Sequence, residues 1–547
     1  MLPRTLIGTF TLLAATAACA KHPQPIAAAP STPKLIIAIS VDQFSSLLFE
    51  EYRGAFTGGL KRLSTGGAVF ANGYQKHAAT ETCPGHSTIL TGDHPTRTGI
   101  IANKWMDLDA TRDDKSIYCS EDENAKGSDS KAYTVSATHL KVPTLGERLK
   151  ALNAASRTVA VAGKDRPAIM MGGHKIDQAW WWTNSNKTYQ FVSFPGSTAP
   201  SVVTTVNAQM KALTDSGYSY PPLPAACEAK IAPIQFGDRT IGIARASMPK
   251  GDGSGLYTHI ALDQATLDIA TGLIADMKLG QGVAPDVLAI GLSVTDPVGH
   301  AFGPEGPEMC GQLYGLDAAL GDFLTKLDAT GIPYAIALTA DHGGGDIPER
   351  KGADPKAVRL DSSIRPLKLD IDLGIELNIP GHAIYSDSGE AGGNLYIAHD
   401  LSPDMRAKVA AAARKHLMDS PFVEAVYSRD EILAAPPPTT APHEWSLLQR
   451  VAASYDTVRS GDLYVVLKEH VQTVSDTGGS VMAHGSVWDY DRRVPILFYG
   501  TGITAGENAG SAETVDIMPT LAAMTYLKLG TGEVDGRCLE SVAACPK

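Results

Sequence analysis

Five short apolar runs recur along this chain, and each one ends in polar residues. They lie at 34–42, 158–166, 286–296, 334–341 and 494–500. Helix-like stretches come between them, at 142–153, 261–278, 308–330 and 512–527. Strands that are apolar throughout are buried on both faces, and their alternation with helices is typical of a parallel sheet. The pattern predicts an α/β fold in which a central, mostly parallel sheet is sandwiched by helices.

Two regions break this alternation. Residues from about 167–255 are rich in Pro and Gly and have little periodicity, whereas residues 346–480 contain a small strand–helix–strand unit. We interpret both regions as insertions that form a cap over the sheet. At 547 residues the chain is long enough for such additions to a large core. The core would then comprise residues 34–345, with the first insertion inside it, and residues 481–547 would complete it.

The acidic composition limits the possible partners. The formal net charge is −12, which argues against a broad surface for nucleic acids or anionic membranes. It does not exclude a small anionic substrate, because metals and local cations set the field inside a cleft. We expect no transmembrane segment in the mature chain, and we expect a monomer.

Residues 1–20 resemble a signal peptide. Arg4 is followed by an almost uncharged, apolar stretch at 6–18 and then by small residues, and the apolar stretch is too short for a spanning helix. We expect this segment to be removed, a flexible linker at 21–33, and a soluble protein that is periplasmic or secreted. Two alternatives are a lipid anchor on Cys19 and an uncleaved membrane anchor. The lipid anchor is less favoured, because the residue three positions before Cys19 is not aliphatic.

Export changes how the cysteines are interpreted. Without Cys19, six cysteines remain, and an even number in an oxidising compartment favours disulfides over thiolate metal sites. Cys538 and Cys545 close a short loop and are the pair that we expect. The sequence leaves the pairing of the others open; these are Cys83, Cys119, Cys227 and Cys310.

Acidic and imidazole side chains gather where the apolar runs end. They are Asp42 after the first run, Asp296 and His300 after the third, Asp341 and His342 after the fourth, and His484 shortly before the fifth. In parallel sheets, ligands bind beyond the carboxyl ends of the strands. Three carboxylates and three imidazoles can form two zinc sites that each stay open for substrate. Any one of these residues alone would more simply be a cap or turn residue, so the prediction depends on the whole set.

Thr82 is the second candidate for chemistry. It lies in the segment HAATETCPGHSTILTG, shortly before a helix-like stretch. A hydroxyl at the N-terminus of a helix faces free backbone N–H groups, which suit a phosphoryl group. A bound metal can stabilise the threonine alkoxide and so replace a general base. The alternative is that Thr82 is only a helix cap.

Taken together, these segments resemble the alkaline phosphatase superfamily, which also includes nucleotide pyrophosphatases/phosphodiesterases and arylsulfatases. The resemblance is carried, in chain order, by SVDQF, ATETCPGHSTILTG, IIANKW, GKDRPAI, SVTDPVGHAFGP, ADHGGG and MAHGS. It spans roughly residues 34–547 and is greatest with the PafA-like bacterial alkaline phosphatases. The formylglycine chemistry of sulfatases is not expected, because Cys83 is not followed by the arginine that the sulfatase motif Cys-x-Pro-x-Arg requires.

The resemblance implies a role for each candidate residue. Two zinc ions would be bound, with Thr82 as the nucleophile that forms a phosphothreonine. The first zinc would be held by Asp296, His300 and His484, and the second by Asp42, Asp341 and His342, with Thr82 completing the second site.

Three further residues bear on the substrate. By resemblance, Asn103, Lys164 and Arg166 would bind phosphoryl oxygens. A phosphate monoester exposes more free oxygens and charge than a diester, so the two cations favour the monoester; alternatively, they could form surface ion pairs. We therefore predict a phosphoric monoester hydrolase, an alkaline phosphatase of broad substrate range that scavenges phosphate. The alternatives are a phosphodiesterase or nucleotide pyrophosphatase of the same superfamily, and a catalytically inactive metal-binding surface protein.

Overall fold

The computed structural model describes residues 32–184, 188–352, 354–387, 392–474 and 479–546. The expected signal peptide at 1–20 and nearly all of the expected linker at 21–33 lie outside the described residues. Within the described part of the chain, none of the helices has the length and apolarity needed to cross a membrane.

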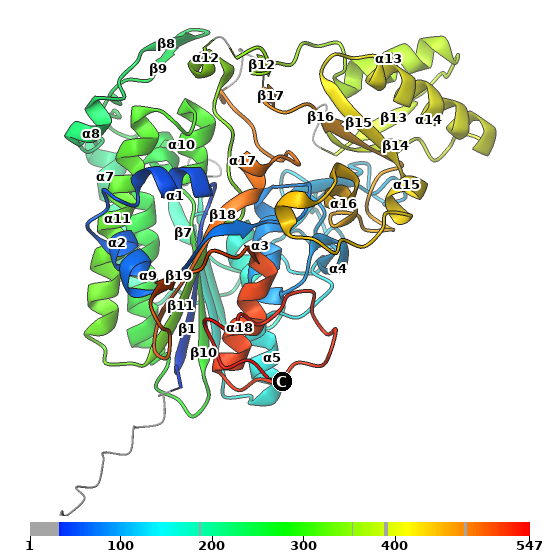
Figure 1. Ribbon diagram of the computed structural model, residues 1–547. Helices are drawn as coiled ribbons and strands as arrows, with labels where there is room; N and C mark the ends of the chain where they lie inside the picture. The colour runs from blue at the N-terminus through cyan, green and yellow to red at the C-terminus, as the bar shows by residue number, and fades with distance from the viewer. Residues whose placement is uncertain (1–31, 185–187, 353, 388–391, 475–478, 547) are drawn as a thin grey trace, which may run out of the picture.

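A ten-stranded sheet forms the centre of the molecule (Figure 1), with the strand order β19-β2-β18-β11-β1-β10-β5-β6-β7 and β20 beside β2. The strands are β1 (Leu35–Val41), β2 (Ala68–Tyr74), β5 (Thr158–Ala162), β6 (Gln178–Thr183), β7 (Gln190–Val192), β10 (Asp286–Leu292), β11 (Tyr334–Thr339), β18 (Arg493–Gly500), β19 (Gly506–Glu507) and β20 (Ala512–Glu513). From β11 to β6 all neighbours are parallel, whereas β18 runs antiparallel to β11 and β2. The predicted mostly parallel sheet is confirmed.

Strand β1 shows why helices cover both faces of the sheet. Its side chains alternate between two apolar cores, with Ile37 and Ile39 in one and Ile36 and Ala38 in the other, as the two-residue period of a strand requires. The first core includes α1 (Ser46–Tyr52), α2 (Gly59–Gly66), α7 (Ser201–Ser216), α9 (Ala261–Asp276) and α11 (Pro307–Asp328). The second includes α3 (Thr82–Thr91), α5 (Leu145–Leu152), α6 (Asp165–Gly172) and α18 (Ile517–Met524).

Part of the region at 167–255 is not a cap. Strands β6 and β7 extend the central sheet, and α7 packs into one of its two main cores. The three tryptophans at 180–182 are buried in β6. An aromatic strand followed by Pro-rich segments has neither aliphatic nor helical periodicity, which is why the sequence pattern concealed it. The rest of the region includes α8 (Ala225–Glu228) and a hairpin of β8 (Ile234–Phe236) and β9 (Arg239–Ile241).

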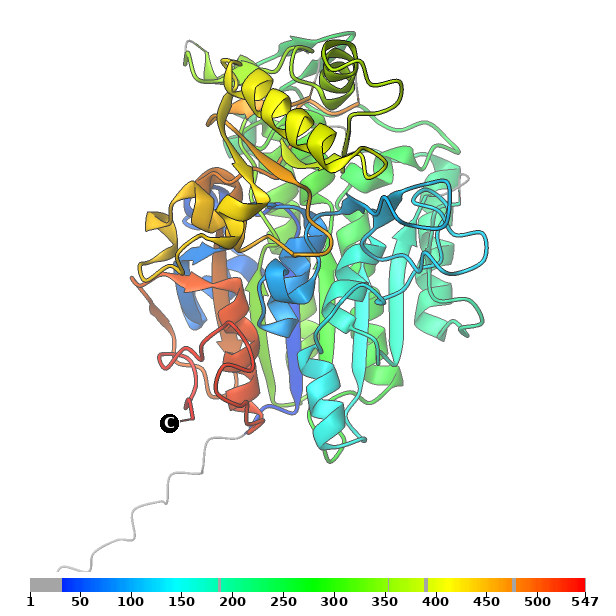
Figure 2. The same ribbon diagram turned by 90° about the vertical axis from the view of Figure 1, so that its right-hand side faces the viewer.

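The region at 346–480 contains a smaller α/β unit with its own apolar core. Its four-stranded sheet has the order β13-β14-β16-β15. The elements are α13 (Pro366–Glu376), β13 (Ile384–Ser386), β14 (Gly393–Ile397), α14 (Pro403–Met418), β15 (Val423–Ser428), α15 (Arg429–Leu433), α16 (Leu447–Ala452), β16 (Leu463–Leu467) and β17 (Val471–Gln472). Figures 1 and 2 show this unit, hereafter the cap, above the end of the central sheet at which the parallel strands finish.

Three disulfides join the described cysteines. They are Cys83–Cys119, Cys227–Cys310 and Cys538–Cys545. The predicted pair of Cys538 and Cys545 is confirmed, and the structure supplies the two pairings that the sequence left open.

Candidate active site

The ends of three adjacent strands assemble the site. Strand β1 lies between β10 and β11 in parallel register, so the carboxyl ends of all three meet at one edge of the sheet. That edge carries Asp42 after β1, Asp296 and His300 on α10 (Thr295–Phe302) after β10, and Asp341 and His342 after β11. His484 comes from the loop before α17 (Asp489–Arg492).

These six side chains form two groups of three, and within each group the potential ligand atoms lie within 4.8 Å of one another. In the first group, Nε2 of His300 and of His484 lie 3.2 and 3.4 Å from Oδ1 of Asp296. In the second group, Nε2 of His342 lies 3.4 Å from Oδ1 of Asp42 and from Oδ2 of Asp341. The groups match the two ligand sets that the resemblance implied.

Backbone carbonyls orient all three histidines. Nδ1 of His300, His342 and His484 lies 2.9, 2.8 and 2.8 Å from the carbonyl oxygens of Met482, Gly343 and Thr80, respectively. If each Nδ1–H donates to its carbonyl, the lone pair of each ring lies on Nε2, the atom that faces the group.

Three atoms of the second group are buried without a hydrogen-bond partner among the described residues. They are Oδ1 of Asp42, Oδ2 of Asp341 and Nε2 of His342. Buried polar atoms of this kind are rare in proteins unless an ion or a water satisfies them. The donor set therefore fits a divalent metal ion, with imidazole and carboxylate ligands.

Lys164 connects the two groups. Its Nζ donates to Oδ2 of Asp42 at 2.7 Å and to Oδ2 of Asp296 at 2.6 Å, which leaves Oδ1 of each carboxylate facing its own group. Burial and the negative charge of Asp341 raise the pKa of Asp42 to about 6, which reflects the crowding of carboxylates here. The sequence had suggested a phosphate contact for Lys164 but not this pair of ion pairs.

The N-terminus of α3 is fixed against the second group. Thr82 is the first residue of α3 and is buried. The helix packs so closely that a Cβ atom at Gly85 would lie 2.0 Å from the carbonyl oxygen of Asp341. Nδ1 of His86 lies 2.8 Å from the carbonyl oxygen of Thr82 and 3.1 Å from Oδ2 of Asp341. His86 was not a predicted site residue, although its position one helical turn after Thr82 was a signal for it.

Asn103 is tied to the residues on either side of Thr82. Its Oδ1 accepts from the backbone N–H of Cys83 at 2.8 Å, and its own N–H donates to Oε2 of Glu81 at 2.6 Å. The Cys83–Cys119 disulfide adds a covalent link to the same segment. The structure therefore brings Asn103 beside the start of α3.

Arg166 lies in the first turn of α6 and makes no ion pair within the described part of the chain. Its guanidinium lies 5.9 Å from the ring centroid of Tyr118, and its buried Nε has no described partner. The carboxylate of the neighbouring Asp165 instead accepts hydrogen bonds from the hydroxyls of Tyr118, Ser120 and Tyr133, each with an oxygen–oxygen distance of 3.0 Å. The charge of Arg166 is thus available to an anion, and the alternative of a surface ion pair is not what the structure contains.

Gln43 is a site residue that the sequence analysis missed. Its backbone has φ = 64°, a strained region for residues other than glycine. Its N–H donates to Oδ1 of Asp341 at 3.1 Å, and its Nε2 donates to Oδ1 of Asp296 at 3.0 Å, so it contacts both groups. A Cβ atom at Gly299 would lie 1.6 Å from its Oε1, which explains the glycine before His300.

The sequence profile described as type I phosphodiesterase / nucleotide pyrophosphatase matches residues 36–488. The chain belongs to this family. The family falls within the alkaline phosphatase superfamily, so the resemblance found in the sequence is confirmed.

Named relatives cover almost the whole chain. Alkaline phosphatase PhoK of Sphingomonas sp. is 49% identical over 525 residues, which are 95% of this chain and 92% of PhoK. Alkaline phosphatase PhoD of Zymomonas mobilis is 45% identical over 550 residues, covering 98% of this chain and 94% of PhoD. The crystal structure of alkaline phosphatase PafA superposes with a TM-score of 0.79 at 25% identity and covers 94% of this chain and 100% of PafA. The α/β fold with its mostly parallel sheet is therefore the PafA fold.

Proposed function

We propose that this protein is a zinc-dependent alkaline phosphatase that hydrolyses phosphate monoesters through a phosphothreonine on Thr82. The observation that carries the proposal is the pair of three-residue groups, joined by Lys164 and flanked by the N-terminus of α3. Relatives named as alkaline phosphatases, at 45–49% identity over most of the chain, support the same reaction.

Two zinc ions would be held by Asp296, His300 and His484 and by Asp42, Asp341 and His342. When bound, they would supply positive charge where the attacking and departing oxygens of a displacement at phosphorus develop negative charge. The mixture of imidazole and carboxylate in each group favours zinc over magnesium.

Two features support Thr82 as the nucleophile: it is buried at the start of α3, and this helix packs against Asp341 of the second group. Its Oγ would form a bond to phosphorus while the bond to the leaving alcohol breaks, and water would then cleave the phosphothreonine to release inorganic phosphate. The backbone N–H groups at the start of α3 suit phosphoryl oxygens. Arg166 and the side-chain amide of Asn103 would bind the remaining oxygens, and a planar guanidinium can contact two of them at once.

Lys164 would serve both the carboxylates and the phosphoryl group. Its two ion pairs limit repulsion between Asp42 and Asp296, and the same ammonium group would add positive charge at the place where the phosphate binds. We further propose export after loss of residues 1–20, a broad range of small phosphate monoesters, a monomeric state and a two-part organisation of core and cap.

Phosphodiester hydrolysis is the second candidate function, because the matching family profile is described by that activity. Arg166 makes no ion pair with the described residues, and its charge favours the monoester, since a diester has fewer free oxygens. Rates for a matched monoester and diester, measured on purified protein before and after chelation, would distinguish the two. A faster diester would establish the second function in place of the first.

Thr82→Ala provides the direct test of the mechanism. We expect folding and bound zinc to be retained but turnover to fall to the background rate, because the covalent route is lost. Thr82→Ser should keep part of the activity and should yield a phosphoserine, which mass spectrometry of acid-quenched enzyme can detect. Wild-type turnover by Thr82→Ala would mean that water attacks directly.

A further inference from the structure

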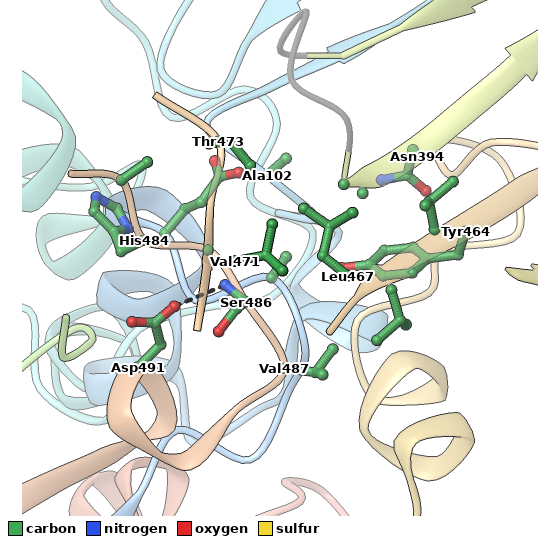
Figure 3. Close-up of a pocket in the computed structure, with 18 of the residues that line it drawn as sticks. Ala102, Asn394, Tyr464, Leu467, Val471, Thr473, His484, Ser486, Val487 and Asp491 are labelled. Atoms are coloured by element: carbon green, nitrogen blue, oxygen red, sulfur yellow. Dashed lines mark hydrogen bonds between the residues drawn. The ribbon is translucent and has the colours of Figure 1, made fainter. Parts of the chain in front are cut away.

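A pocket lies between the candidate active site and the cap. Ala102 and the loop that carries His484 form one side of it, and cap strands β14 and β16 form the other (Figure 3). Glu81 also lines the pocket, next to Gly485 of that loop. Glu81 directly precedes Thr82 in the chain, and His484 belongs to the first ligand group. A group attached to phosphorus at Thr82 therefore has this pocket beside it.

Much of the lining is apolar. The side chains concerned are Tyr464, Val466, Leu467, Val471 and Val487. Figure 3 shows Tyr464 and Leu467 on the cap side, opposite His484 and Ser486. Apolar and aromatic walls with a few polar groups are typical of sites for small organic molecules. The pocket thus suits a carbon framework rather than water or a phosphate ion alone.

The charged groups of the pocket are mainly acidic. Glu81, Asp387 and Asp491 line it, and Lys468 is the one lysine or arginine among the described lining residues. Carboxylates accept hydrogen bonds from hydroxyl groups and repel anions. The lining therefore favours an uncharged molecule with hydroxyl groups.

Glu81 is held so that one of its oxygens remains available. Its Oε2 accepts the backbone N–H of Asn103 at 2.6 Å, while its Oε1 has no hydrogen-bond partner among the described residues. Burial, together with the charges of Asp387 and Glu81, raises the pKa of Tyr464 above its ordinary value. The phenol therefore stays protonated and can donate to, or accept from, a hydroxyl group.

We propose that this pocket holds the leaving group of the substrate and selects uncharged, hydroxyl-bearing alcohols over anionic ones. The inference rests on the monoesterase function proposed above, and it gives the cap a role in that reaction. The substrate class would be the phosphate monoesters of polyols, sugars or nucleosides, whereas esters whose leaving group carries a carboxylate or a further phosphate would react poorly.

Glycerol 3-phosphate and 3-phosphoglycerate test the selection, because their leaving groups are similar in size and differ by one carboxylate. We expect the zinc-loaded protein to favour glycerol 3-phosphate in kcat/KM by about ten- to thirtyfold, the effect of one like charge at a partly screened separation. Leu467→Lys would place a cation on the cap wall and should reduce this ratio by about tenfold, mainly because the carboxylate-bearing ester would then have a lower KM.

Leu367→Lys is the matched control, because Leu367 is 72% exposed on α13 and does not line the pocket. Val471→Lys is a second test variant in case Leu467→Lys fails to fold. Methyl phosphate separates the two proposals, since methanol is too small to reach the cap wall. If methyl phosphate is hydrolysed but the wild-type ratio is near one, or the control shifts it as much as the test variants, the pocket assignment is wrong. If none of the three esters is hydrolysed, the proposed function itself fails.

Discussion

The two oxygens of each ligand carboxylate have different partners. Oδ1 of Asp42 and of Asp296 face histidine Nε2 atoms, whereas Oδ2 of both accepts from Lys164. In Asp341 the roles are exchanged: Oδ2 faces His342, and Oδ1 accepts the backbone N–H groups of Gln43 and His342. These supporting bonds fix the orientation of each carboxylate, which is how proteins preorganise a metal site.

Gln43 gives a prediction about metal affinity. Gln43→Ala removes the amide that donates to Asp296, and we expect zinc affinity to fall about tenfold or more, as is usual when a partner of a ligand is lost. Competition with a coloured chelator measures this directly. Gln43→Gly is the matched control: it loses the same amide, but glycine accepts φ = 64° without strain. The glycine variant should therefore be the more stable of the two while binding zinc equally weakly. Unchanged zinc affinity in both would contradict a positioning role.

Arg166 gives a prediction about specificity. Because it makes no ion pair in the described part of the chain, Arg166→Ala should leave stability nearly unchanged. It should lower kcat/KM for a monoester by about ten- to hundredfold, the loss of charge-assisted hydrogen bonds worth ~1.5–3 kcal/mol, and should lower it much less for a diester. Steady-state rates for both esters measure the ratio.

Lys164→Ala is the informative comparison for Arg166. The variant removes the ammonium group that pairs with the carboxylates of Asp42 and Asp296. It should therefore weaken zinc binding as well as catalysis and reduce the rates for both the monoester and the diester. If Arg166→Ala also lowered both rates equally, Arg166 would serve phosphate in general and the preference for monoesters would lose its main support.

The sequence predicted which residues gather into the two groups but not the bonds among them. Asp42, Asp296 and Asp341 follow recognisable strands, and their order along the chain carries the resemblance. The contacts of Gln43 with Asp341 and Asp296 join residues 298 and 253 positions apart. Such contacts depend on how strand ends are stacked in three dimensions, which a one-dimensional pattern does not contain.

At the scale of elements, aliphatic strands were predictable and mixed ones were not. β1, β5, β10 and β11 are short aliphatic runs buried on both faces, and the sequence located all four. β2 was missed, because Asn72 and Gly73 interrupt its apolar run. The antiparallel direction of β18 was not predictable either, since direction depends on the path of the chain and not on the composition of the strand.

Helix α3 gives a prediction at this scale. Alanine normally stabilises a helix by ~1 kcal/mol relative to glycine, yet Gly85→Ala would bring a Cβ atom to 2.0 Å from the carbonyl oxygen of Asp341. Because that atom belongs to the backbone, we expect the helix to shift and the free energy of unfolding to fall by ~1–3 kcal/mol. Activity should fall more steeply, since Thr82 and Asp341 would move apart.

Gly54→Ala is the control for Gly85→Ala, because a Cβ atom at Gly54 meets nothing within 4 Å. Thermal unfolding and monoester turnover of the two variants can be compared directly. A Gly85→Ala protein that is as stable and active as Gly54→Ala would show that α3 is not held in place by this contact.

At the scale of the whole molecule, the site depends on the complete core. Its ligands extend from Asp42 to His484, and the loop carrying His484 follows the cap in the chain. The resemblance and the order of the motifs predicted this assembly. The placement of the cap over the site was predicted only in outline, because the packing of one unit on another depends on side chains scattered through both.

Metal removal is the prediction for the whole molecule. Without zinc, three buried carboxylates face one another with Lys164 as their only ammonium partner in the described site, so the folded state should be destabilised. A ligand that binds only the folded state stabilises it by ~2.7 kcal/mol at a hundredfold excess over its Kd. We therefore expect chelation to lower the unfolding midpoint and abolish turnover together, and zinc to restore both better than magnesium does, because each group contains imidazole.

Because Asp42, Asp341 and His342 are linked to the other group through Gln43 and Lys164, Gln43→Ala should need more zinc to regain the same midpoint. Full activity and an unchanged midpoint after exhaustive chelation would contradict a metal site of any kind here.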